Sequence, residues 1–544
     1  MSGNFYTFGR LLDRIADRYP DNPAVTSEGT TINYSELRKT VNKFAAGLLA
    51  VGVKRGDRVA LLMDNRPEWL VVDFAVTSIG AVLVPINIRY RSYELNHLFN
   101  NCKPSTLILI DSFLNTNFLE MIYDLSSERL KKGKGGLRPE KFPFLKNIFC
   151  LSSSQYPGIA RYEDIFDRGA EVSIDEVNVA KEVVKEEDLA QILYTSGSTG
   201  APKGAMLTQY NFCKHGESIS DRMRVTHEDR FWVPIPLSFS FSTANAVMNA
   251  LSKGACLVLQ RIFEPGEALK LIEAERCTVM YATPTIYLPM ADHSTLKTVD
   301  ISSLKKGIVM GTPQNIIRAI EDMGVEQVSN AYGMTETTAI STLSDPLDPV
   351  DIRRNANGFP FPGVSIAIKD PETERPVPTG EDGEFRVKGY NVMKGYLDDE
   401  GKMSDAFDEE GYLRTGDIGM MREDGYVVFK GRYKDMLKTS GINVSTMEVE
   451  VFLETHPDVQ VAHVVGIPDE LKEEVGFANI KLSPGSTCSE KEILNFCKGM
   501  IASYKIPRYI RFISEFPLTS SGKVKKKDLR EKAIAEIIGD ARRV

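Results

Sequence analysis

Residues 194–204 of the chain read YTSGSTGAPKG, and no other stretch says more about the fold and the chemistry. This segment follows an apolar run at residues 189–193 that is typical of a buried strand. It precedes MLTQYNFCKHG, in which Thr208 can cap a helix. The pattern therefore predicts a glycine-rich loop that joins the end of a strand to the start of a helix.

The residue types in this loop suit the binding of a polyphosphate. Gly197, Gly200 and Gly204 let the backbone approach a ligand closely, while the hydroxyl groups and Lys203 supply donors and a positive charge. No Gly-Lys-Ser/Thr triplet ends the loop, which argues against a P-loop ATPase or kinase. A flexible Gly/Ser linker is the alternative interpretation, but a linker needs neither the lysine nor the flanking apolar segments.

Strands and helices alternate over the first hundred residues. Asn33 and Glu36 have the spacing of a capping box and predict the start of a helix. Short apolar runs at residues 58–63, 81–86 and 106–110 predict buried strands. Such alternation is typical of parallel sheets covered by helices, whose ligands bind at the carboxyl ends of the strands.

Two segments depart from this alternation. Residues 131–146 are basic and glycine-rich, and we interpret them as an exposed loop insertion, with a nucleic-acid-binding patch as the alternative. In residues 364–430, short apolar runs are separated by Gly, Pro and Asp clusters, which predicts a small β unit.

The last hundred residues return to a mixed α/β pattern. Residues 445–448 (STME) form a capping box, residues 461–467 predict a strand, and residues 527–541 predict a terminal amphipathic helix. We expect the domain boundary just before this part, which gives an N-terminal domain of residues 1–433 and a C-terminal domain of residues 434–544.

Composition and charge exclude several classes of protein. The 544 residues are 42% hydrophobic and 26% charged, which is ordinary for a globular enzyme and excludes collagen and disordered chains. A net charge of -8 disfavours nucleic acid as the main partner. The seven cysteines contain no C-x-x-C pair, which argues against a disulfide framework and favours a reducing compartment, the cytoplasm. Neither a signal peptide nor a membrane span is expected.

Four further motifs follow the loop in order: YGMTETT at 332–338, YLRTGD at 412–417, GRYKDMLKTSGINVS at 431–445 and PLTSSGKVKKKDLR at 517–530. Together with the loop they resemble the adenylate-forming superfamily of acyl-CoA synthetases, peptide-synthetase adenylation domains and luciferases. The resemblance spans nearly the whole chain. It implies an α/β fold with a large N-terminal domain of two parallel-sheet lobes plus a small β unit, and a smaller mobile α/β C-terminal domain.

The resemblance also implies a site for ATP. The loop and Lys203 would hold the β and γ phosphates, which leave as pyrophosphate. Tyr332 would offer its ring to adenine, a role compatible with core packing, and Asp417 would accept from two ribose hydroxyls. The positions that match the nucleotide-binding residues of the family are Thr195, Ser196, Gly197, Ser198, Thr199, Gly200, Gly311, Thr312, Pro313, Tyr332, Asp417 and Arg432.

The remaining matches are catalytic or conformational. Glu336 would hold a Mg²⁺ ion that bridges the phosphates, and Thr335 would contact the α phosphate. Lys523 would bind the carboxylate and the α-phosphate oxygens during adenylation. Lys434 matches the hinge of the family, and Gly441 matches a loop that lines the channel for CoA. A lone Thr-Glu pair is usually a helix N-terminus, so these roles depend on the whole set of motifs.

The chain departs from its relatives around the expected acyl pocket, where the resemblance places Phe239 and Gly333. Pro236-Leu237 is followed by Ser238 and Phe239 instead of the common aromatic–His pair. Ser240 stands where amino-acid adenylation domains have Asp, which disfavours an amino-acid substrate. Gly333 replaces the Trp of acetyl-specific relatives, so a larger acid should fit, and a tryptophan there is expected to restrict the enzyme to short acids.

The sequence therefore predicts an AMP-forming acid:CoA ligase for a hydrophobic carboxylic acid, either a medium- or long-chain fatty acid or an aromatic or alicyclic one. Its partners would be the acid, ATP and CoA, without nucleic acid, and the resemblance allows a homodimer. An acyl-AMP ligase that loads the phosphopantetheine thiol of a carrier protein is the main alternative. A luciferase stays formally open, whereas a noncatalytic adenylate-binding protein should have lost Lys203, Glu336, Asp417 or Lys523.

Overall fold

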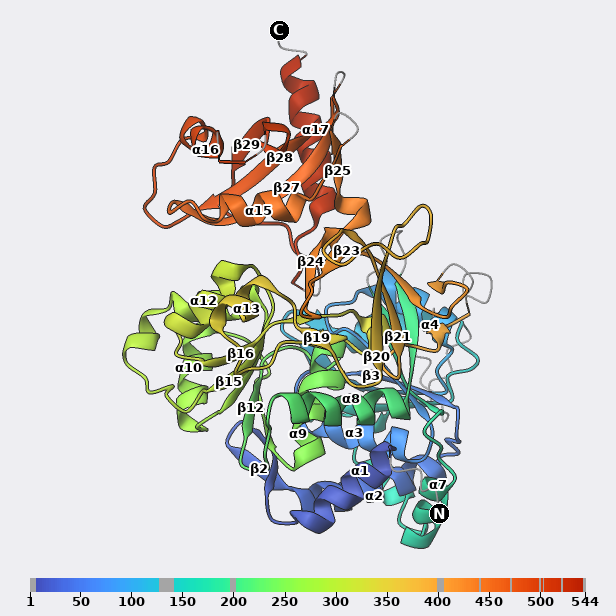
Figure 1. The fold of residues 1–544 in the computed structure, drawn as a ribbon. Coiled ribbons are helices and arrows are strands. Elements are labelled where there is room, and N and C mark those ends of the chain that lie inside the picture. Colours follow the sequence, from blue (N-terminus) through green and yellow to red (C-terminus); the bar gives the residue numbers. More distant parts are fainter. Residues whose placement is uncertain are drawn as a thin grey trace.

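The chain folds into a large lower body and a smaller upper body, which the region around β24 (Val427–Arg432) connects (Figure 1). The computed structural model describes residues 6–126, 141–195, 202–398, 406–439, 442–469, 472–498, 500–501, 503–519 and 522–541.

An eight-stranded sheet forms the first lobe of the lower body. Five consecutive strand pairings in it are parallel, from β10 across β4, β3, β5 and β8 to β9. On the other side of β10, strands β11 and β22 add an antiparallel edge. The strands, in spatial order, are β22 (Gly395–Tyr396), β11 (Lys203–Thr208), β10 (Leu189–Thr195), β4 (Val82–Pro85), β3 (Arg58–Leu62), β5 (Thr106–Ile110), β8 (Asn147–Leu151) and β9 (Ala160–Arg161).

A seven-stranded sheet forms the second lobe. It is parallel except for the hairpin of β1 and β2 at one edge. Its strands, in spatial order, are β16 (Gln327–Ser329), β15 (Lys306–Val309), β14 (Val279–Ala282), β12 (Arg230–Val233), β13 (Cys256–Leu259), β1 (Pro23–Ser27) and β2 (Thr30–Asn33). The two predicted parallel-sheet lobes are therefore confirmed.

One hydrophobic core joins the two lobes. Helix α3 (Pro67–Ser78) lies within it, and all ten residues 69–78 are buried, as expected for a helix that packs on every side. Helix α8 (Gln209–Arg222) meets α3 where Gln209 Nε2 donates to the carbonyl of Thr77, and α9 (Met248–Lys253) packs against α8 at Gly216 (Figure 1). The other helices of this body are α1 (Phe8–Arg18), α2 (Tyr34–Ala50), α4 (Ser92–Cys102), α5 (Phe118–Ser126), α6 (Asp164–Arg168), α7 (Ile174–Glu182), α10 (Pro265–Ala274), α11 (Pro284–Ala291), α12 (Pro313–Glu321) and α13 (Val350–Asn355).

The predicted β unit is a four-stranded antiparallel sheet beside the two lobes. A three-stranded sheet, which begins with β17, lies in the same part of the chain. The strands of the two sheets are β20 (Val364–Lys369), β21 (Gly383–Gly389), β23 (Leu413–Met421) and β24, and β17 (Ala331–Tyr332), β18 (Thr342–Leu343) and β19 (Phe359–Pro360).

The upper body has a sheet and cores of its own. Its hydrophobic clusters consist only of residues between Leu437 and Ile537, so it packs independently of the lower body. Its strands are β25 (Leu437–Thr439), β26 (Ile442–Val444), β27 (Val459–Asp469), β28 (Glu473–Leu482) and β29 (Tyr509–Phe512), and its helices are α15 (Thr446–Leu453), α16 (Glu490–Cys497) and α17 (Lys526–Ala541).

Local predictions agree with these elements except at the glycine-rich loop. Asn33 and Glu36 form the predicted capping box of α2, and Ser445 caps α15. The loop, however, does not run from a strand directly into a helix. It connects β10 to β11 as an antiparallel hairpin in which Thr195 pairs with Lys203, and α8 begins only after β11, with Thr208 as its N-cap. Strand β11 was not predicted, because its six residues contain no long apolar run.

Three further expectations concern the cysteines, membrane-spanning helices and the basic segment. All seven cysteines are free thiols, and six of them are buried. Within the described parts of the chain, no helix combines the length and the apolarity that crossing a bilayer requires. Residues 131–140 of the basic segment lie outside the described residues, and residues 141–146 form turns before β8.

Candidate active site

Tyr332, Asp417 and Arg432 form the centre of the site. The strands β17, β23 and β24 carry them, and the antiparallel register of β23 with β24 places Asp417 opposite Arg432. The Tyr332 hydroxyl donates to Asp417 Oδ2 at 2.9 Å, and Arg432 Nε lies 3.3 Å from Asp417 Oδ1. Residues from three strands thus meet at one buried carboxylate.

Burial dominates the electrostatics of this carboxylate. Asp417 is only 3% exposed, and burial raises its pKa, which Arg432 and the Tyr332 hydroxyl oppose. Oδ1 has the ion-pair contact with Arg432 but no hydrogen bond from any described residue. A buried acceptor of this kind gains from a ligand that donates hydroxyl protons.

The Tyr332 ring is packed by other aromatic rings. Its centroid lies 4.7 Å from that of Phe385, edge to face, and 5.6 Å from that of Phe429. The residue is 5% exposed. Core packing is therefore certain for Tyr332, and contact with adenine stays a prediction.

Thr335 and Glu336 lie in a short 3₁₀ helix, η3 (Thr335–Thr337), which follows β17. Glu336 is 6% exposed, and its Oε1 accepts a hydrogen bond from the Tyr396 hydroxyl at 2.7 Å. Lys203 Nζ lies 4.9 Å from the centroid of the Tyr396 ring, a cation–π arrangement. Strand β11, which follows the glycine-rich loop, therefore begins close to Glu336.

Tyr396 is a site residue that the sequence did not reveal. It belongs to β22, which pairs with β11 and so brings the segment around residue 396 to the lysine of the loop. The two strands are almost 190 residues apart in the chain, and the surrounding sequence KGYL has no distinctive pattern. Only the sheet topology could have identified it.

Ser240 contacts the same catalytic segment from the other side. Its Oγ lies 3.1 Å from Thr335 Oγ1, and its carbonyl accepts from Asn245 Nδ2 at 3.3 Å. Asn245 in turn bonds to His215, a buried imidazole whose pKa burial lowers to about 3. Because that ring is neutral, the chain of hydrogen bonds holds Thr335 without adding a charge. The segment after Ser240 is a π-helix, η1 (Phe241–Val247), a form often found at functional sites.

Phe239 and Gly333, the predicted acyl-pocket residues, flank this contact in the sequence. Phe239 is half-buried and directly precedes Ser240, while Gly333 lies two residues before Thr335. A Cβ atom at Gly333 would lie 2.2 Å from the carbonyl oxygen of Ala339 and 2.6 Å from Ile340 Cα. The expectation that a tryptophan here would fill a pocket is therefore corrected, because even a methyl group would displace the backbone.

Replacing Gly333 with alanine is expected to destabilise the protein by about 2 kcal/mol, since the added carbon overpacks against backbone that cannot give way. The measurement is the free energy of unfolding in urea. Gly476→Ala is the matched control, because its nearest neighbour would be 3.3 Å away and the cost should be smaller. A Gly333→Ala variant as stable as the parent would contradict this packing argument.

The predicted adenine turn, Gly311-Thr312-Pro313, connects β15 to α12. Thr312 is the N-cap of α12, and its Oγ1 accepts from Asn315 N at 3.4 Å. Gly311 has φ +151°, and a Cβ there would meet the side chain of Asn315 at 2.9 Å. The turn thus needs glycine for both conformation and space.

Lys523 reaches the site from the upper body. Its backbone is held by Thr519, which accepts from Lys523 N at 3.0 Å and donates from its own N to Lys523 O at 2.7 Å. The Lys523 side chain is in contact with solvent, but the surrounding protein partly desolvates it, and this desolvation lowers the pKa of the ammonium. The positive charge of Arg432 lowers this pKa further, whereas the carboxylates of Asp417 and Glu336 raise it. The way the upper body sits on the lower body therefore brings Lys523 within electrostatic range of both carboxylates.

The remaining predicted positions are only partly placed. Thr195 and Lys203 end the hairpin strands, with Thr195 Oγ1 3.5 Å from Lys203 O. Lys434 lies in the 3₁₀ turn η5 (Tyr433–Asp435), directly after β24. The predicted residues that lie outside the described part are Ser196, Gly197, Ser198, Thr199, Gly200 and Gly441.

The donor groups at Glu336 fit a magnesium ion bound together with phosphates. Mg²⁺ prefers hard oxygen ligands and is usually held by one or two carboxylates plus substrate phosphates. Glu336 Oε1 accepts a hydrogen bond from the Tyr396 hydroxyl. The Glu336 carboxylate and the Thr335 hydroxyl are hard oxygen ligands on one short helix. In the described residues, the side chains whose ligand atoms lie close enough together to hold a metal ion are His456, Asp458 and Cys488 of the upper body, so no preformed protein cage surrounds Glu336.

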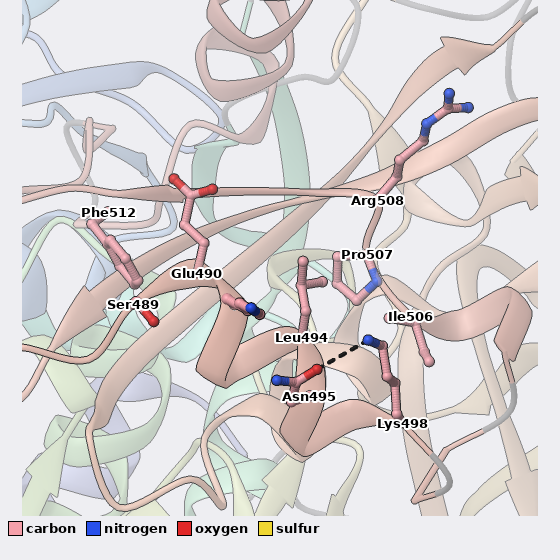
Figure 2. A pocket seen from close by; sticks show the side chains of 10 residues that line it. Ser489, Glu490, Leu494, Asn495, Lys498, Ile506, Pro507, Arg508 and Phe512 are labelled. Carbon is pink, nitrogen blue, oxygen red and sulfur yellow. Dashed lines mark hydrogen bonds between the residues drawn. The ribbon is translucent and has the colours of Figure 1, made fainter.

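A separate pocket of about 730 Å³ lies in the upper body, and Figure 2 shows the side chains that line it. It lies between α16 and the segment that leads into β29, and Lys498 and Asn495 are hydrogen-bonded on its wall. None of the predicted site residues lines it. It is therefore distinct from the cluster around Asp417 and Glu336.

Comparisons with known proteins agree with this geometry. The family model described as AMP-binding enzyme matches residues 12–397, and the model of the AMP-binding enzyme C-terminal domain matches residues 448–523. The chain is 36% identical over 533 residues to a putative acyl-CoA synthetase, YngI, of Bacillus subtilis, with 97% of each chain covered. It is 32% identical to the mitochondrial medium-chain acyl-CoA ligase ACSF2 of Danio rerio, covering 97% of this chain and 88% of that protein.

Among solved structures, the anthranilate CoA ligase AuaEII in complex with anthranoyl-AMP superposes with a TM-score of 0.84 at 26% identity, covering 98% of both chains.

Proposed function

Because the chain belongs to the AMP-binding enzyme family, we propose that it is an ATP-dependent acid:CoA ligase that activates a hydrophobic carboxylic acid as its acyl-adenylate. The acyl group then passes to CoA, with release of AMP and pyrophosphate. The observation that carries this proposal is the convergence of Lys523, Asp417 and Glu336 from two bodies of the protein on one site.

In the first half-reaction, a carboxylate oxygen attacks the α phosphorus of ATP. The bond from that phosphorus to the bridging oxygen of the β phosphate breaks, and pyrophosphate leaves. Negative charge builds on the α-phosphate oxygens in the transition state, where the Lys523 ammonium and the Thr335 hydroxyl stabilise it. Positioning of the two reactants in line supplies much of the remaining rate.

The nucleotide is held by the groups already described. Asp417 accepts from the two ribose hydroxyls, with Arg432 as a further donor, and Lys203 with the hairpin loop holds the β and γ phosphates. The turn at Gly311-Thr312-Pro313 lies against adenine. Glu336 would hold Mg²⁺, which when bound neutralises phosphate charge.

In the second half-reaction, the thiol sulfur of CoA attacks the acyl carbon, the bond from this carbon to the AMP oxygen breaks, and the thiol proton is released. We propose that residues 434–544 form the mobile domain that turns about Lys434 between the two steps. Gly441 would then line the channel for the thiol arm. The separate hydrophobic cores of the upper body support a domain that moves as one unit.

A hydrophobic acid is supported by the residues around Thr335. Phe239 is half-buried and apolar, and Ser240 supplies a neutral hydroxyl where an ammonium group would need a carboxylate. The relative in Danio rerio is named a medium-chain ligase, and AuaEII is named for an aromatic acid. Both names lie within the proposed range of substrates.

A screen of carboxylic acids tests this function. The purified protein is supplied with ATP, magnesium, CoA and acids from acetate to palmitate, together with benzoate and cyclohexane carboxylate, and thioester formation is measured. We expect turnover of medium-sized apolar acids. Adenylate formation without any transfer to CoA, but with transfer to a phosphopantetheinylated carrier protein, would instead establish the alternative acyl-AMP ligase.

A further inference from the structure

Helix α4 contacts both sides of the glycine-rich hairpin. His97 Nε2 lies 3.1 Å from the carbonyl oxygen of Pro202, the residue that precedes β11. One helical turn later, Asn101 Oδ1 accepts a hydrogen bond from the hydroxyl of Tyr194, near the end of β10. Residues four apart lie on the same face of a helix. One face of α4 therefore binds the hairpin at the end of one strand and at the start of the other.

Chemistry fixes the donor and the acceptor in each of these contacts. A carbonyl oxygen can only accept, so His97 Nε2 carries the proton and donates it to Pro202. Burial raises the pKa of Tyr194, which keeps its hydroxyl protonated as the donor to Asn101. Both bonds therefore need only neutral groups.

The opposite face of α4 is anchored in the hydrophobic core. The helix is also held at its carboxyl end, where Arg58 Nη1 of β3 donates to the carbonyl of Cys102 at 2.8 Å. The helix therefore gives the hairpin a fixed support. Its buried residues are Leu95, Leu98, Phe99 and Cys102.

The ring of Tyr194 crosses from β10 over the neighbouring strand. Tyr194 is opposite Gly204 in the register of β10 with β11. A Cβ atom at Gly204 would lie 3.2 Å from Tyr194 Cζ and 2.8 Å from Ile192 Cγ2. The glycine therefore leaves room for the ring, whose hydroxyl end reaches α4.

The two contacts with α4 determine where Lys203 lies. Pro202 precedes this lysine, and Thr195 pairs with it across the hairpin. Lys203 Nζ lies 4.9 Å from the centroid of the Tyr396 ring, and the hydroxyl of Tyr396 donates to Glu336. The support from α4 therefore extends through the hairpin to the groups that the proposed function assigns to the phosphates and their metal ion.

We propose that His97 and Asn101 are positioning residues for the β and γ phosphates of ATP. They bind the two sides of the hairpin and so hold Lys203 where it meets these phosphates. This inference rests on the proposed function. A binding site is tight when its donors are held in place before the ligand arrives, so the loss of either bond should weaken the binding of the β and γ phosphates selectively.

Calorimetry with ATP and with AMP tests the inference, because AMP lacks the β and γ phosphates. With His97→Ala, we expect the affinity for ATP with magnesium to fall about tenfold and the affinity for AMP to change by less than about twofold. Tyr194→Phe keeps the ring over Gly204 but removes the donor to Asn101, and it should show the same selective loss. His97→Gln places an amide N–H near the position of the ring Nε2 and should restore most of the affinity for ATP.

Asn100→Ala is the matched control on α4. Asn100 is exposed, and its Nδ2 donates to the carbonyl of Asn96 in the same helix at 2.8 Å, so its loss should leave both affinities unchanged. A partly unfolded sample would bind less of both nucleotides without changing the ratio of the two affinities. An unchanged affinity for ATP in His97→Ala, or an equal loss of affinity for ATP and AMP, would overturn the inference.

The parent protein separates this inference from the proposed function. A parent that binds neither ATP nor AMP would refute the proposed function and, with it, the role of α4. A parent that binds both nucleotides, with a His97→Ala variant that keeps the same preference for ATP over AMP, would refute the role of α4 alone.

Discussion

Replacing Lys523 with alanine is expected to slow acyl-adenylate formation on the order of 10³-fold, which is the scale of losing a preorganised charge at a transition state. The ammonium faces the site from the upper body, within electrostatic range of Asp417 and Glu336. Lys203, the other predicted cation of the site, lies next to Tyr396, with its Nζ 4.9 Å from the ring centroid. The measurement is single-turnover formation of the acyl-adenylate with saturating ATP and acid.

The second half-reaction provides the internal control for this variant. Thioester formation from preformed acyl-adenylate should change by less than about threefold, since the proposed rotation of the domain moves Lys523 away from the phosphate before this step. Lys525→Ala controls for the loss of charge in the same lysine run, because Lys525 is exposed and lies 4.0 Å from Asp528. Equal losses in both half-reactions would remove the proposed role of Lys523.

Replacing Asp417 with alanine is expected to weaken ATP binding roughly 100-fold, because it would remove the two charge-assisted hydrogen bonds that we propose between this carboxylate and ribose. The carboxylate is nearly fully buried, and its Oδ1 has no hydrogen bond from the described residues. Ribose hydroxyls are the donors that would satisfy it. Calorimetry with ATP measures the loss directly.

Nucleotide analogues separate ribose recognition from general damage at Asp417. The parent should bind 2′,3′-dideoxy-ATP more weakly than ATP, whereas Asp417→Ala should bind the two equally. Tyr332→Phe removes the hydroxyl that donates to Asp417 and keeps the carboxylate, so its affinity for ATP should fall much less. A variant without Asp417 that still prefers ATP over the dideoxy form would contradict the ribose assignment.

The sequence predicted those parts of the fold whose signals are local. Strands β3 and β5 are short apolar runs, and Asn33 and Ser445 lie beside the residues that they cap, so each could be identified from a few neighbouring positions. The motif residues Tyr332, Asp417 and Glu336 could be identified because the resemblance rests on them. The structure brings these three residues and Lys523 together.

What the sequence could not predict depends on contacts between distant segments. Tyr396 reaches Glu336 only because β22 pairs with β11, and Gln460 reaches Asp292 only because the two bodies meet. The need for glycine at position 333 arises from the backbone of Ala339 and Ile340, which fold back over it. Nothing in the local sequence around these residues encodes such partners. The roles of all the predicted site residues stay predictions, and the loop residues 196–200 and Gly441 lie outside the described part of the chain.

Acid-dependent exchange of labelled pyrophosphate into ATP tests the central claim most directly, because it requires a reversible transfer of AMP to a carboxylate and nothing else. With magnesium, ATP and a medium-sized apolar acid, the purified protein should catalyse this exchange without CoA, and Lys523→Ala should nearly abolish it. A folded parent protein that shows no exchange with any acid from acetate to palmitate, benzoate included, would contradict the account.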